Sequence, residues 1–221
     1  MRVSLSATSA IMAPISIAPR TSHVALDADG SPRAYHPNNE GIDDNRNAGY
    51  PNKGWKSVLV VDPNDPSEPH VQRDGAPFPG YFVSKTSLRS HTTADIDPAA
   101  YVNSEAIPYI VFPGAFYAIK GTGRYGDLAM VRAIGTNHET CAIVADGGPT
   151  KAPLGEMSLA LATALGGDQH PNPRNGRGAP RGTFEYIIFP GSAAQPAWPR
   201  TLADIDARAR ALLADLGGWP A

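Results

Sequence analysis

The sequence predicts a mainly β fold of the α+β class, in which a single β-barrel domain carries two or three helices. One observation is that short apolar segments follow one another without the strand–helix–strand alternation of a parallel α/β sheet. Another is that the 221 residues include 22 Gly and 22 Pro, which follow no repeat. Such a composition is typical of a chain with many turns and few long helices.

Six segments show the pattern of short strands bounded by turn residues. They are Ser57–Asp62, Gly80–Leu88, Ile107–Gly114, Asp127–Ile134, Glu139–Asp146 and Thr183–Gly191. The sequence Gly-Thr-Asn-His between the fourth and fifth segments predicts a hairpin loop. The sequence Asp-Ala-Asp-Gly at residues 27–30 predicts a tight hairpin turn.

Two segments have the signals of helices. The first spans about Leu154–Leu165 and is ended by two glycines. The second begins after Thr201, which can cap it, and runs to about Leu216. Its apolar residues recur near helical spacing, so we expect it to pack on the outside of the barrel through Leu202, Ile205, Leu212 and Leu216.

Composition excludes several classes of protein. The chain has 19 Lys and Arg against 21 Asp and Glu and no polybasic segment, so we expect no nucleic-acid partner. Cys141 is the only cysteine, which excludes an intramolecular disulfide scaffold. No apolar run reaches the length of a transmembrane helix, so we expect no membrane partner. We expect a monomer.

No sequence motif predicts a metal or a cofactor. The six histidines form no HExxH pattern. The sequence at Gly121–Gly126 matches G-x-G-x-x-G, but it leads into a predicted strand and not into a helix. The Asp-Ala-Asp-Gly sequence begins like a calcium loop but lacks the later ligands. We therefore predict that the protein uses no cofactor.

The chain divides into residues 1–22, an N-terminal extension, and residues 23–221, the functional domain. The extension is a poor signal segment, because Pro14 and several Ser and Thr residues interrupt its apolar region.

Two carboxylates stand out. Asp146 ends a predicted strand, and Glu156 lies at the start of a predicted helix. A turn signal explains Asp146 by itself, and the helix dipole explains Glu156. Together they suggest a site, because cleavage of a glycosidic bond requires two carboxyl groups, one as acid and one as base or nucleophile.

The surrounding residues suit a sugar cleft. Aromatic residues lie in or beside the predicted strands and turns, and their rings can stack on sugar rings; they are Tyr35, Tyr50, Trp55, Tyr81, Phe82 and Tyr109. Residues 27–74 contain nine acids and five Lys or Arg, a bias that suits a cationic substrate or an ordinary solvated surface.

Four motifs, in order, resemble those of the fungal-type chitosanases, glycoside hydrolase family 75. In chain order they are GYFVSKTSL (80–88), YVNSEAIPYIVFPG (101–114), GRYGDLAMV (123–131) and DGGPTKAPLGE (146–156). The resemblance spans about residues 55–192. The chain departs from the family pattern at Gly147, where an apolar residue is expected, and at Ala152-Pro153. The Gly126-Asp127 pair also resembles the turn of double-psi barrels, which implies that topology.

The resemblance implies endo-hydrolysis of β-1,4 bonds in chitosan with inversion, outside the cell, by the acids Asp146 and Glu156. The helix dipole favours the ionised form of Glu156, which suits the base, and desolvation at the end of an apolar run favours the protonated form of Asp146, which suits the acid. The assignment depends on how far each group is buried. We predict that substrate also contacts Asp43, Asp44, Tyr81, Lys85, Tyr109 and Asp127. The alternatives are a hydrolase of another amino-sugar polymer, such as peptidoglycan or partly acetylated chitin, and a non-catalytic polysaccharide-binding barrel.

Overall fold

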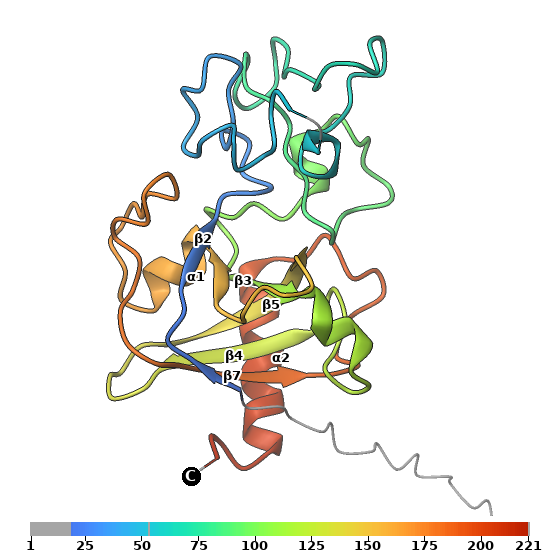
Figure 1. Ribbon diagram of the computed structural model, residues 1–221. Coiled ribbons are helices and arrows are strands. Elements are labelled where there is room, and N and C mark those ends of the chain that lie inside the picture. The colour runs from blue at the N-terminus through green and yellow to red at the C-terminus, as the bar shows by residue number, and fades with distance from the viewer. Residues whose placement is uncertain (1–18, 53, 221) are drawn as a thin grey trace, which may run out of the picture.

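The computed structural model describes residues 19–52 and 54–220. Figure 1 shows two parts: a curled β-sheet with two α-helices, and an irregular lobe above it built from about residues 28–108. The predicted signal segment falls almost wholly outside the described residues. The predicted mainly β fold with helices is confirmed. The double-psi topology remains a prediction.

Seven strands form one sheet, curled into a half-barrel, in the order β1-β7-β4-β5-β3-β6-β2. Neighbours pair antiparallel except for the parallel pairs β2–β6 and β3–β5. The strands are β1 (Arg20–Thr21), β2 (Ala25–Asp27), β3 (Tyr109–Pro113), β4 (Leu128–Ala133), β5 (Glu139–Gly148), β6 (Glu156–Ser158) and β7 (Phe184–Phe189). β1 lies within the predicted extension, yet it belongs to the sheet.

The four central strands agree with the sequence patterns. β3, β4, β5 and β7 lie within or close to the predicted segments, and β4 and β5 form the expected hairpin. Alternate residues of these strands face two separate apolar clusters, one containing Met130 and Ile143 and the other containing Ala129 and Val144. Both faces of the sheet are therefore buried, which explains why the strand sequences are almost continuously apolar.

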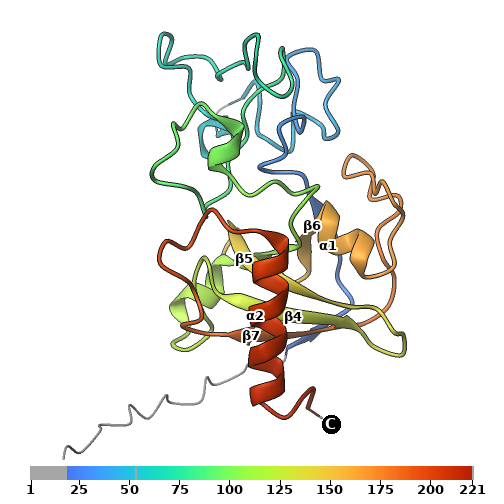
Figure 2. The ribbon, with the colours of Figure 1, turned by 180° about the vertical axis from the view of Figure 1, so that it is seen from behind.

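The two α-helices cover opposite faces of the sheet. α2 (Leu202–Asp215) crosses β4 and β5 on one face, as Figure 2 shows, and the hydroxyl of Thr201 caps it. Ile205 is buried there and Leu212 and Leu216 pack beside it, but Leu202 is 42% exposed, so its predicted contact is wrong. Leu202 is the first helical residue and does not belong to the apolar cluster beneath α2. α1 (Leu159–Ala164) packs on the other face.

The irregular lobe corrects two predicted strands. Ser57–Asp62 and Gly80–Leu88 contribute only isolated bridges, such as Leu59 with Ser84 and Val61 with Pro69. The prolines of this region lack the N–H groups that a continuous ladder requires. Three short 3-10 helices complete the described elements: η1 (Trp55–Ser57), η2 (Pro98–Ala100) and η3 (Gly114–Ala118).

A tight turn forms after Asp27, where the Ser31 N–H donates to the Ala28 carbonyl at 3.1 Å, but the prediction that it joins a hairpin is wrong. β2 ends at Asp27, and the chain then leaves the sheet to enter the irregular lobe. β2 pairs instead with β6, a strand that comes much later in the sequence. Among the described residues, no helix is both long and apolar enough to cross a membrane.

Candidate active site

Asp146 lies near the end of β5, where the pairing with β3 is irregular. Ile110 pairs with Val144, but the next residue of β3, Val111, pairs with Asp146. β5 therefore has an extra residue at this point, which is a β-bulge. Bulges bend a strand and redirect its side chains, and they are common beside active sites.

Glu156 begins β6, on the other side of β3 from β5. The prediction that it starts a helix is wrong: α1 begins at Leu159, and its N-cap is Ser158, whose hydroxyl accepts a hydrogen bond from the Leu161 N–H. Residues 156–158 are extended because they pair with β2. The helix dipole therefore acts at Ser158 and not at Glu156.

The two acids lie close together across this part of the sheet. A Cβ on Gly148, two residues after Asp146, would lie 3.3 Å from Oε2 of Glu156. The charge of Asp146 also raises the pKa of Glu156. The structure thus brings together the two acids that the sequence singled out.

Asp146 is held by three hydrogen-bond donors. Its Oδ1 accepts from the Ser87 hydroxyl at 2.6 Å, the Gly147 N–H at 2.7 Å and the Ser87 N–H at 3.2 Å. Burial raises the pKa of Asp146 above its usual value, and these donors and the charge of Lys85 offset part of that rise. The donors favour the ionised carboxylate.

Glu156 has the opposite environment. Among the described residues no group donates a hydrogen bond to its carboxylate, and its pKa is raised by burial and by the charge of Asp146. Both influences favour the protonated form. The two acids are therefore of one chemical type but differ in their readiness to carry a proton.

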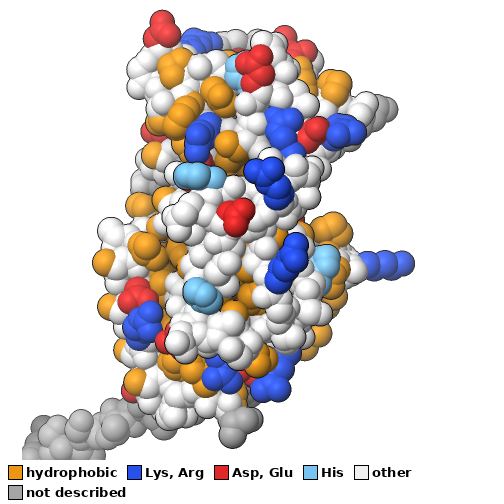
Figure 3. Space-filling model, turned by 90° about the vertical axis from the view of Figure 1, so that its left-hand side faces the viewer, with side chains coloured by type: hydrophobic (Ala, Val, Ile, Leu, Met, Phe, Trp, Pro, Cys, Tyr) orange, Lys and Arg blue, Asp and Glu red, His pale blue; other side chains and the backbone are white. Residues whose placement is uncertain are grey.

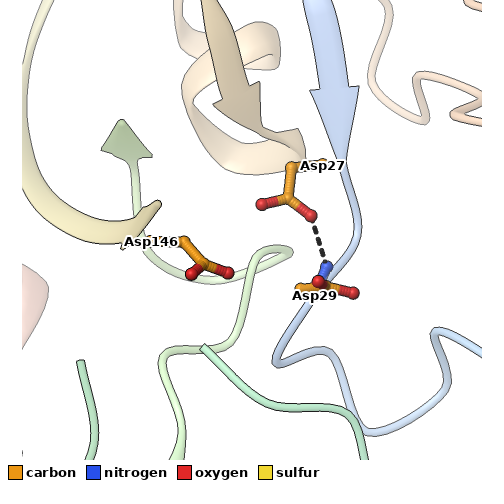
Figure 4. A group of neighbouring side chains, drawn as sticks. All are labelled: Asp27, Asp29 and Asp146. Carbon is orange, nitrogen blue, oxygen red and sulfur yellow. Dashed lines mark hydrogen bonds between the residues drawn. The ribbon is translucent and has the colours of Figure 1, made fainter. Parts of the chain in front are cut away.

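Two further acids, Asp27 and Asp29, lie beside Asp146 (Figure 4). Asp27 is buried at the end of β2 and accepts a hydrogen bond from the Asp29 N–H at 2.9 Å. The Tyr35 hydroxyl donates to Asp29 at 2.8 Å. The pKa of each is raised well above its usual value, first by burial and then by the neighbouring carboxylates. Sequence reasoning assigned these acids to a turn and missed them.

The acid cluster can hold positive charge or protons. One oxygen from each of Asp27, Asp29 and Asp146 lies within 4.8 Å of the other two, which is a spacing that a hard divalent cation accepts. A substrate ammonium group or shared protons would satisfy the same oxygens. No further feature of the described residues distinguishes a metal from these.

Two clefts open beside the cluster. One, of about 440 Å³, is lined by Asp27, Asp29 and Glu156 from the sheet side and by Tyr35, Asp43 and Asn47 from the lobe. The other, of about 590 Å³, is lined by Asp146, Ser87, Lys85 and Tyr101 among others. A larger cavity of about 900 Å³, between α1 and α2, contains none of the four acids.

The six predicted substrate contacts divide into two groups. Asp43 and Lys85 line the clefts, although the Lys85 ammonium group donates a hydrogen bond to the Lys56 carbonyl at 2.6 Å. The other four do not line either cleft: Asp44, Tyr81, Tyr109 and Asp127.

Each of these four has a structural partner. Asp44 forms an ion pair with Arg46 at 3.0 Å, and the Tyr81 ring packs 4.8 Å from that of His36. Tyr109 is fully buried, and its hydroxyl donates to the Asp29 carbonyl. Asp127 is fully buried and accepts from two backbone N–H groups, so it cannot meet a polymer.

The other predicted aromatic residues mostly form the core of the lobe. Tyr35, Trp55 and Phe82 are buried, and Tyr50 packs against them. Figure 3 shows one face of the molecule, on which Lys, Arg, Asp and Glu side chains are interspersed and no single charge predominates.

Two carboxyl groups on the strands that flank β3, held in different environments beside polar clefts, are typical of a glycoside hydrolase. The family described as fungal chitosanase of glycosyl hydrolase group 75 matches residues 73–215. The match covers more than half of the chain, so the protein belongs to this family, and it is a chitosanase-like glycoside hydrolase with a polysaccharide substrate. The matched range includes Asp146 and Glu156, and it begins after Asp29. None of the curated proteins matches the chain.

Proposed function

We propose that the protein cleaves internal β-1,4 bonds of chitosan with inversion, with Asp146 as the base and Glu156 as the acid. The observation that carries this assignment is the contrast between the three donors on Asp146 and their absence, among the described residues, at Glu156. These roles are the reverse of those favoured by the helix dipole, because Glu156 lies on a strand.

In this mechanism Glu156 gives its proton to the glycosidic oxygen as the bond from that oxygen to the anomeric carbon breaks. Asp146 takes a proton from a water molecule, whose oxygen attacks the anomeric carbon from the opposite face. The water thus supplies a hydroxyl to one product and a proton to the protein. Inversion of this kind requires a carboxyl separation of roughly 6.5–9.5 Å.

The acid cluster supports a cationic substrate. Asp27, Asp29 and Asp43 line the 440 Å³ cleft beside Glu156. An ammonium group there would offset their mutual repulsion. We therefore propose that this cleft takes the amino group of a glucosamine unit and disfavours an acetylated one, whose amide is neutral.

The test combines kinetics with the stereochemistry of the product. Asp146→Asn and Glu156→Gln should each lower hydrolysis of glucosamine oligomers by about 10²–10⁴-fold while the protein stays folded. Asp44→Asn is the matched control, because Asp44 is paired with Arg46 away from the clefts. NMR of the first product should show the α-anomer; a β-anomer would contradict inversion.

The two roles are separated by the leaving group. An aryl glycoside with an acidic phenol needs little protonation, so Glu156→Gln should lose less activity on it than on an oligomer. Asp146→Asn should lose activity equally on both. The opposite pattern would assign the base role to Glu156. Faster cleavage of peptidoglycan or of highly acetylated chitin would contradict the proposed substrate.

We also propose that the enzyme acts outside the cell, because a polysaccharide chain does not diffuse across a membrane. Immunoblots of the medium and of washed cells should find the protein in the medium. Retention of the active protein inside cells would contradict this proposal.

A further inference from the structure

An exposed aromatic ring lies beside the catalytic strand in a place that sequence reasoning did not identify. Tyr117 belongs to η3, the short helix that follows β3, and is 39% exposed. Its ring centroid lies 5.1 Å from that of Tyr125.

The two tyrosines pack directly against the residue that follows Asp146. A Cβ on Gly147 would lie 2.3 Å from the Tyr125 hydroxyl and 3.6 Å from the Tyr117 ring. Burial raises the pKa of the Tyr117 hydroxyl, and the Tyr125 hydroxyl and, to a smaller extent, the charge of Asp146 raise it further. The glycine at position 147 therefore leaves room for this pair, where the family resemblance leads one to expect an apolar side chain.

The ring is held in a defined position. Phe112, a buried residue of β3, packs 5.7 Å from Tyr117 and 5.5 Å from Phe116. The Thr122 hydroxyl donates to the Ile119 carbonyl at 2.9 Å and also to that of Phe116, which closes the loop after η3. A ring supported in this way loses little freedom when a ligand covers it.

We propose that Tyr117 is a sugar-binding platform, on which one pyranose ring of the substrate stacks in the subsite next to the scissile bond, and that Tyr125 positions it. The inference rests on the proposed function. The apolar faces of a glucosamine ring match a flat aromatic surface, and the ring's ammonium group can remain near the acids. Asp146 and Gly147 are consecutive residues at the end of β5 and face opposite sides of the strand, so the platform would hold a sugar where the polymer extends past this strand end.

The experiment compares Tyr117→Ala, Tyr117→Leu and Tyr117→Phe on glucosamine oligomers of defined length. The Ala and Leu variants should raise KM about 3- to 10-fold with a smaller change in kcat, and should alter the ratio of products, because one subsite no longer holds its sugar. Tyr117→Phe retains the ring and should remain near the parent in both. Leu keeps apolar volume against Phe112, so it preserves packing if Ala does not.

Leu202→Ala is the matched control, since Leu202 is 42% exposed and lines the cavity between the helices. It should leave KM and products unchanged. If the parent cleaves the oligomers and the folded Ala and Leu variants match it in KM and products, the platform is refuted while the proposed function stands. If the parent neither cleaves nor binds these oligomers, both the platform and the proposed function fail.

Discussion

At the scale of single residues, the most informative contact is the one between Ser87 and Asp146. Ser87 comes from the irregular lobe, 59 residues before Asp146, and it supplies two of that acid's three hydrogen bonds. Hydrogen bonds to a charged group are worth about 1.5–3 kcal/mol, which corresponds to about 1 pKa unit or more. Ser87 therefore governs the pH range in which Asp146 is ionised.

Replacing Ser87 should change the pH dependence of catalysis. The serine hydroxyl stabilises the ionised form and so lowers the pKa of Asp146. In Ser87→Ala that pKa rises, and if Asp146 is the base, the acid limb of the pH–rate profile should move upward by about 1 pH unit. Ser87→Thr keeps the hydroxyl and should restore the original limb. A shift of the alkaline limb instead would make Asp146 the acid.

Gly147 offers a second test at the same scale. Gly147→Ala places a methyl group 2.3 Å from the Tyr125 hydroxyl, so we expect a loss of about 1–3 kcal/mol in the free energy of unfolding. In a Tyr125→Phe background the nearest ring atom is at 3.4 Å, and the same substitution should cost less. Urea unfolding of the four proteins measures the coupling. Equal costs in both backgrounds would show that the hydroxyl does not occupy this space.

At the scale of elements, β6 and α1 together decide where Glu156 lies. Ser158 joins them: its hydroxyl accepts from the N–H groups of Tyr109 and Leu161 and donates to the carbonyl of Ile107. One buried hydroxyl thus caps α1 and ties β6 to the start of β3. This junction sets the position of Glu156 at the other end of β6.

Ser158→Ala should therefore lower the free energy of unfolding by more than the loss of an ordinary helix cap does. Three backbone groups lose their partner in a buried place, and we expect a destabilisation of about 2–4 kcal/mol. For a chain of this size the melting temperature should fall by roughly 5–15 °C. Thr201→Ala, which removes the cap of the more exposed α2, is the comparison and should cost about 1 kcal/mol. Similar losses in the two variants would argue against the junction.

At the scale of the whole molecule, the sheet and the irregular lobe meet at a group of carboxylates. Asp27, Asp146 and Glu156 belong to the sheet, and Asp29 stands where the chain enters the lobe. Burial raises the pKa of all four, and the neighbouring carboxylates raise those of Asp27, Asp29 and Glu156 further. The free enzyme is therefore strained electrostatically where a cationic polymer would bind.

This cluster should make the protein less stable as the pH rises. Between the unfolded pKa of Asp, about 3.9, and the raised folded pKa of Asp27, the native state binds more protons than the unfolded state. Stability then decreases with pH over that window and is greatest below it. We expect the melting temperature to fall between pH 5 and pH 8.

Asp27→Asn should flatten this pH dependence, because the amide still accepts the Asp29 N–H but does not ionise. Asp44→Asn is the control, since the pKa of Asp44 is lowered by Arg46 and its titration contributes only at more acidic pH. Melting curves in buffers from pH 5 to pH 8 test both variants. A slope in Asp27→Asn equal to that of the parent would mean that Asp27 does not titrate with folding.

Much of the sheet and part of the site follow from the sequence alone. The central strands and α2 were predictable because apolar runs, turn residues and the Thr201 cap act within a few residues of each other. Asp146 and Glu156 were recognisable for the same reason, since they belong to one continuous motif. The family match to residues 73–215 confirms the family resemblance to which that motif contributed.

Only the tertiary structure decided which other residues join those two acids. Asp27 looks like a turn residue until β2 pairs with β6, and the same pairing makes Glu156 part of a strand. Ser87 reaches Asp146 across the boundary between lobe and sheet. Such contacts depend on long-range pairing and chain closure, which local periodicity does not encode. The sequence alone thus determined the two carboxyl groups to which we assign the reaction, and the fold determined their environments and their neighbours.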